Sequence, residues 1–271
     1  MLLALLACTA QPDRYRVLQL QDDGAYALEN RAIDGLTDAS RLEGDYGIGY
    51  TGGALLINWS TGNWSYEEGR RLDILHSVDA GVAYPLDRDG LVLYSFYAHL
   101  EDAAAGLAEA GLDITPLFPI NIAVTPSLSD PSLAFLPAEN AAYAPSANTF
   151  ILLDDLVAKE VPLAANRGVV THEFGHGTFH YLTTGGDVYG PGLSTDNDAT
   201  LSNHVSSLDE GFADMLACLL TDDPASFEAS LAVPERDATG DHVAAEVAVL
   251  PDEAEGLGYD PYPLGTVFAS L

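Results

Sequence analysis

One segment of this chain, His172-Glu173-Phe174-Gly175-His176, constrains the fold more than any other. Two histidines four residues apart lie on the same side of an α-helix, where their rings can share one metal ion. The glutamate between them can reach a water molecule bound to that metal. The segment therefore predicts a central helix over about 165–183 that carries a zinc site, with His172 and His176 as ligands and Glu173 as general base.

Two glycines within this predicted helix also carry information. At 100° per residue the histidines fall on one side and apolar residues such as Phe174 fall opposite, so neither side is suited to water. Gly175 and Gly177 each cost about 1 kcal/mol in a helix interior relative to alanine. Their presence suggests that a neighbouring group approaches the helix backbone closely, as in a buried helix beside a metal.

A second pair of ligand-type residues follows 34 residues after His176, in Ser207-Leu-Asp-Glu-Gly-Phe-Ala-Asp-Met-Leu-Ala217. Glu210 and Asp214 are again four residues apart and share one helix face, while Leu208, Phe212, Met215, Leu216 and Leu219 form an apolar stripe. We expect Glu210 to be the third zinc ligand. Asp214 is expected to accept the free ring N–H of a zinc-binding histidine and to fix its tautomer.

Other interpretations of these residues remain open. Ser207 and Glu210 also match a capping box, so the carboxylates would then only begin a surface helix. Asp187, 11 residues after His176, is a competing third ligand and faintly resembles the aspzincin pattern. His180 is expected to be a core or substrate-side residue, and His204 a loop histidine that lines the cleft.

The order of apolar and turn-forming segments predicts an α+β fold. Strand-like alternation runs from Tyr15 to about Tyr94, and near-repeats at Asn58 and Asn63 flank Thr-Gly like the arms of a hairpin. A helix is expected over about 95–110, ended by Gly111, and buried strands are expected at 120–125 and 149–154.

The two four-residue pairs resemble the gluzincin metallopeptidases, particularly thermolysin-like and fungalysin-like enzymes. That family carries His-Glu-x-x-His followed by a helix with Glu-x-x-x-Asp. The resemblance covers roughly residues 90–271 and implies a zincin-like fold, bound Zn²⁺ and hydrolysis of polypeptides. By the same resemblance, Asn140 and Ala141, which precede the strand from Phe150, are expected to line the substrate site at an edge strand.

The chain departs from the family pattern near its end. Family members carry a histidine that donates to the developing oxyanion, and Tyr262 stands in the comparable place here. A phenol also donates hydrogen bonds, so Tyr262 or His204 is expected to take this role. The sequence stops within a predicted helix, and we expect a further C-terminal part. The alternative function is a catalytically inactive zincin-like surface lipoprotein that acts as a binding or structural module.

The acidic composition limits the class of partner. The chain has 41 Asp and Glu residues against 10 Lys and Arg, a formal net charge of −31, which repels nucleic acid. The expected partner is a polypeptide substrate. Asp87 with Asp89, and Asp196 with Asp198, offer oxygen ligands for Ca²⁺, but such pairs are expected by composition in so acidic a chain.

The first residues resemble the end of a bacterial lipoprotein signal, in which Leu5-Leu6-Ala7 would precede a lipid-bearing Cys8. A lipid on Cys8 would be the chain's one contact with a membrane, and it predicts an extracytoplasmic location, as a cell-envelope lipoprotein or a secreted protein. Cys218 is the other cysteine, so a disulfide framework is not expected. We therefore divide the chain into a signal remnant and tether at 1–14, a β-rich lobe with the His-Glu-x-x-His helix at 15–185, and a mainly helical lobe at 186–271.

Overall fold

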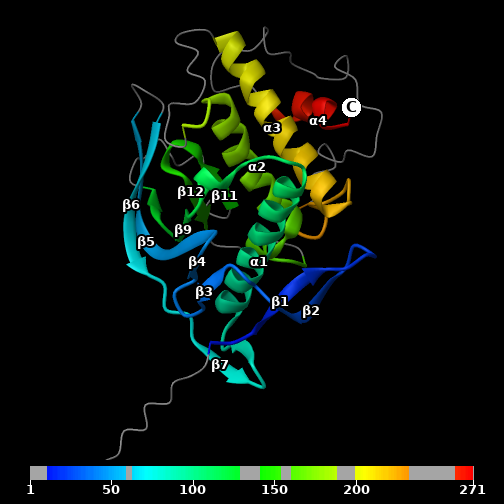
Figure 1. Ribbon diagram of the computed structural model, residues 1–271. Helices are drawn as coiled ribbons and strands as arrows, with labels where there is room; N and C mark the ends of the chain where they lie inside the picture. The colour runs from blue at the N-terminus through cyan, green and yellow to red at the C-terminus, as the bar shows by residue number, and fades with distance from the viewer. Residues whose placement is uncertain are drawn as a thin grey trace, which may run out of the picture.

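The computed structural model describes residues 11–58, 63–128, 141–153, 160–187, 199–231 and 260–270. The positions singled out above that lie outside these residues are Leu5, Leu6, Ala7, Cys8, Asn140, Asp196 and Asp198. The described part is α+β, with β-sheets in the N-terminal part followed by helices (Figure 1). The α+β class predicted from the sequence is therefore confirmed.

The strands come in two sets along the chain. Those before the first helix are β1 (Arg14–Leu20), β2 (Tyr26–Arg31), β3 (Leu36–Asp38), β4 (Glu43–Gly44), β5 (Gly47–Asn58), β6 (Asn63–Arg71), β7 (His76–Asp79) and β8 (Val82–Pro85). Those after it are β9 (Ile120–Val124), β10 (Ser127–Leu128), β11 (Ala141–Ala144) and β12 (Thr149–Leu152). The α-helices are α1 (Arg88–Glu109), α2 (Arg167–Thr183), α3 (Ala199–Thr221) and α4 (Tyr262–Ala269).

The larger sheet supports the candidate site. Its strand order is β11-β12-β9-β5-β4-β3, with β6 and β10 also paired to β5. Strands β5, β9 and β12 run parallel, and β11 joins β12 in antiparallel register at one edge. Asn58 pairs with Asn63 where β5 meets β6, so the predicted hairpin is confirmed.

The smaller sheet, in the order β2-β1-β8-β7, holds the start of helix α2 in place. The Tyr26 hydroxyl oxygen accepts a hydrogen bond from the backbone N–H of Arg167 at 2.6 Å and donates one to Asn166 Oδ1 at 3.2 Å. These contacts join a strand near the N-terminus to the first turn of the histidine-bearing helix. The site therefore depends on a sheet that is distant from it in sequence.

Helix α1 begins earlier than predicted. We expected it to begin near Ser95, but it begins at Arg88, and Asp87 Oδ1 caps it by accepting from the backbone N–H of Gly90 at 2.8 Å. This cap gives the Asp87 carboxylate a structural role. The predicted end is confirmed, because Gly111 follows the helix with a φ of +86°, a conformation that glycine adopts without strain.

The main hydrophobic core lies between the sheets and the helices, with members from β1, α1, β9, α2 and α3. His99 of α1 is enclosed in it, and burial lowers the pKa of this histidine to about 4, so the ring is neutral at pH 7. His99 is therefore a core residue. Among the described helices, none is long and apolar enough to cross a membrane.

Candidate metal centre

Helix α2 presents two histidine rings to one point. Its first turn is fixed by Asn166, whose side-chain oxygen accepts from the backbone N–H groups of Gly168 at 2.8 Å and Val169 at 3.2 Å. Further along, His172 Nε2 and His176 Nε2 lie 3.0 Å apart, with ring planes at 86°. The His172 side chain is only 4% exposed, so the two nitrogens meet away from bulk solvent.

Helix α3 lies close beside α2 because the residues at their contact are small. A Cβ atom on Gly175 would lie 2.7 Å from the Cα of Ala213. One on Gly177 would lie 2.8 Å from the ring of Tyr143 in β11. The close approach expected at both glycines is therefore confirmed, and the neighbours are α3 and β11.

Carboxylates of α3 lie beside the Nδ1 atoms of both rings, on the side away from the paired Nε2 atoms. Asp214 Oδ1 lies 2.9 Å from His172 Nδ1, and Asp209 Oδ1 lies 2.8 Å from His176 Nδ1. An ionised carboxylate only accepts hydrogen bonds, so each Nδ1 carries a proton, and a neutral ring then keeps its lone pair on Nε2. Glu210 Oε2 adds a third electron-pair donor, 3.5 Å from His172 Nε2 and 3.7 Å from His176 Nε2. Three such donors at one point favour a cation between them.

The spacing of these three atoms fits a zinc ion. Atoms separated by 3.0, 3.5 and 3.7 Å lie on a circle of radius about 2.0 Å, close to the zinc–ligand bond lengths for His and Glu. In the described residues, His172, His176 and Glu210 are the one group of three potential ligands whose atoms lie this close together. No protein-family model and no curated protein matches this chain. The site is therefore interpreted from its own geometry, as a buried His/His/Glu cluster on α2 and α3 that can bind a metal ion.

Without a bound metal ion, the cluster attracts a proton. Burial lowers the pKa of His176, but the negative charges of Asp209, Glu210 and Glu173 outweigh burial and raise this pKa to about 10. The proton stabilises the folded state fully below the unfolded pKa of about 6.5, and this stabilisation is lost as the pH rises through about 10. At pH 7, His176 is therefore protonated until a metal ion displaces the proton.

Metal binding is expected to release about one proton per ion at pH 7, because His176 must be neutral to act as a ligand. The apparent affinity should then rise about tenfold per pH unit between pH 7 and 9. Calorimetric titration in buffers with different ionisation enthalpies measures the number of protons. Binding without proton release at pH 7 would show that His176 is already neutral there.

A cavity of about 310 Å³ opens onto the cluster. Glu173 lines it, and Glu173 Oε1 lies 3.9 Å from His172 Nε2. Tyr262 lines it from the first turn of α4. Helix α4 packs closely on α3, since a Cβ on Gly265 would lie 3.0 Å from the backbone nitrogen of Gly211. A carboxylate and a phenol therefore share one cavity with the three ligand atoms.

Two further sides of the cavity differ in character. Edge strand β11 contributes Ala141, and within the described residues β12 is the one strand paired with β11. The other side is apolar, formed by Leu163, Val169, Phe227 and Leu231. The centre of the Phe227 ring lies 5.5 Å from that of His172. The cavity thus combines an edge strand of the described sheet, an apolar side and the candidate ligands.

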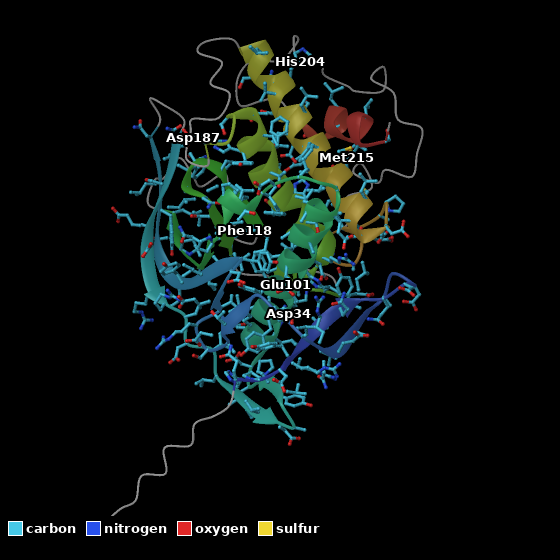
Figure 2. The ribbon with its side chains drawn as sticks, viewed as in Figure 1. Asp34, Glu101, Phe118, Asp187, His204 and Met215 are labelled. Atoms are coloured by element: carbon cyan, nitrogen blue, oxygen red, sulfur yellow. The ribbon has the colours of Figure 1, made fainter. Side chains whose placement is uncertain are left out.

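The alternatives left open by the sequence are resolved in part. Helix α3 begins at Ala199, so Ser207 lies within the helix and the capping-box interpretation is wrong. His204 is an exposed residue near the start of α3 rather than a loop histidine, and it is not among the residues that line the cavity (Figure 2). Asp187 is exposed after the end of α2 and does not belong to the ligand group.

Proposed function

We propose that this chain is a zinc-dependent metalloendopeptidase of the gluzincin type. The observation that carries the proposal is the convergence of His172 Nε2, His176 Nε2 and Glu210 Oε2 beside a cavity lined by Glu173. Structural zinc sites have four protein ligands, whereas catalytic sites have three and keep one position open to the substrate. The three ligands and the adjoining cavity match the catalytic arrangement.

Glu173 is the proposed general base. A zinc ion at this site would supply the positive charge that acidifies water and polarises a carbonyl group. The Glu173 carboxylate would accept the proton of the attacking water and transfer it to the leaving amine. Its position in the cavity, with Oε1 3.9 Å from His172 Nε2, supports this role.

The remaining sides of the cavity suggest how a peptide would bind. An extended peptide would lie along β11, the edge strand of the described sheet, through backbone hydrogen bonds, with Ala141 leaving room beside the strand. The Tyr262 hydroxyl would donate to the carbonyl oxygen as negative charge develops. The apolar side at Phe227 would exclude water from the reacting bond and hold an apolar side chain.

Removal of the metal tests the proposal. The purified protein should cleave casein, lose this activity when a zinc chelator is added, and regain it when zinc is restored, because water activation depends on the metal charge. Release of casein fragments is the measurement, with bound zinc quantified in the same samples. Cleavage that persists in metal-free protein would contradict the proposal. A zinc-loaded protein with no peptide cleavage would instead favour the binding module.

A further inference from the structure

Asp209 is the residue of the cluster that sequence patterns did not indicate. It directly precedes Glu210, so on the helix its side chain points about 100° away from that of Glu210. From there the Asp209 carboxylate lies 2.8 Å from His176 Nδ1, and the Asp214 carboxylate lies 2.9 Å from His172 Nδ1. Each ring therefore has its own carboxylate from α3.

The position of Asp209 is not explained by the helix itself. Helix α3 runs from Ala199 to Thr221, so Asp209 is remote from the first turn, where a carboxylate stabilises a helix. Aspartate is also a poor helix former in a helix interior. In the part of the chain that the structure describes, no Lys or Arg forms an ion pair with Asp209, and its charged partner is His176. The contact with His176 is thus the feature that accounts for an aspartate here.

We propose that Asp209 is a positioning residue for His176. Its carboxylate holds the proton on Nδ1, directs Nε2 toward His172 Nε2 and Glu210 Oε2, and makes the ring a stronger electron-pair donor to a metal ion. This inference rests on the proposed zinc site. Beyond that site, it assigns His176 a carboxylate partner, as His172 has in Asp214. The two carboxylates differ in exposure.

The difference in exposure makes Asp209 suitable for mutation. The Asp209 side chain is 30% exposed, whereas that of Asp214 is 1% exposed. Truncating Asp214 would leave a buried gap, but truncating Asp209 removes a side chain that already reaches solvent. The variants Asp209→Ala and Asp209→Asn should therefore fold, although the metal-free variants lose the stabilisation that the Asp209 charge gives to protonated His176.

Zinc affinity, measured by competition with a chromophoric chelator, is the first test. Asp209→Ala should raise the zinc dissociation constant about 10- to 100-fold, the usual effect of losing such a partner, when both proteins are compared after correction for the proton that zinc displaces from His176. Asp209→Asn keeps an acceptor oxygen but not the charge, and it should recover part of this loss. Asp222→Asn, an exposed position beyond the end of α3, removes the same charge and should leave the affinity unchanged.

Nitrogen NMR of the histidine rings in the zinc-loaded protein is the second test. Asp209→Ala should alter the Nδ1–H signal of His176 and leave that of His172 in place, a selective change that general unfolding would not produce. Parent-like zinc affinity in Asp209→Ala would overturn the inference while leaving the zinc site intact. A parent protein that fails to bind zinc would overturn both the inference and the proposed function.

Discussion

Replacing Glu173 by glutamine is expected to leave zinc bound and to reduce peptide cleavage about 10²- to 10⁴-fold. Glutamine has nearly the same shape as glutamate but cannot accept a proton from water. Glu173 lines the cavity and lies outside the group of three ligand atoms, so the metal should remain. The measurements are kcat/KM for a peptide substrate at saturating zinc and the zinc content of the purified variant.

A matched control separates the role of this carboxylate from a change in net charge. Glu109→Gln makes the same substitution at an exposed position at the end of α1, and it should cleave peptides at the parent rate. Full activity of Glu173→Gln would discard Glu173 as the base. Loss of zinc from that variant would instead identify Glu173 as a ligand.

The sequence was most informative where residue type and helical period agree. His172 and His176 predicted a buried helix over about 165–183, and α2 runs from Arg167 to Thr183. The four-residue spacing fixes the side of the helix on which both rings lie, and that geometry is local. The partner at Glu210 was also predicted, because its spacing from Asp214 repeats the same helical pattern.

Helix boundaries were less predictable. The apolar segment before Ser95 suits a strand as well as a buried helix, and periodicity alone does not separate the two. The cap at Asp87 decides the start of α1 in favour of the earlier position. For α3, Ser207 and Glu210 match a start signal, but the helix had already begun at Ala199. The start signal at Ser207 therefore lies inside a helix that the preceding residues had already formed.

The orientation of α3 was also hidden from the sequence. An apolar stripe normally faces the core. Here Leu208 and Leu219, at the two ends of that stripe, are 45% and 68% exposed, whereas Leu216 between them is buried in the core and the Asp214 side chain is 1% exposed. The polar face therefore also packs inward, because it meets the histidines of α2. The contact of Asp209 with His176 joins residues 33 positions apart, and no spacing rule indicates it.

Replacing Gly175 by alanine is expected to weaken both the fold and the site. The added Cβ would lie 2.7 Å from the Cα of Ala213, whereas carbon atoms in contact prefer about 3.5–4.0 Å. A backbone atom has no alternative rotamer, so α2 and α3 must separate. Alanine gains about 1 kcal/mol in helix propensity, but overpacking of this kind costs about 1–3 kcal/mol, with more expected against backbone.

Separation of the two helices would also move Glu210 away from the histidines, because α3 carries the carboxylate and α2 carries both rings. A displacement of about 1 Å can cost about 100-fold in rate. Gly106→Ala is the matched control: its new Cβ would meet the tip of the Leu220 side chain at 2.6 Å, and that tip can rotate away. The temperature of thermal unfolding and the affinity for zinc should therefore both fall in Gly175→Ala. Both should change little in Gly106→Ala. Equal behaviour of the two variants would show that the contact between Gly175 and Ala213 does not set the distance between the histidines and Glu210.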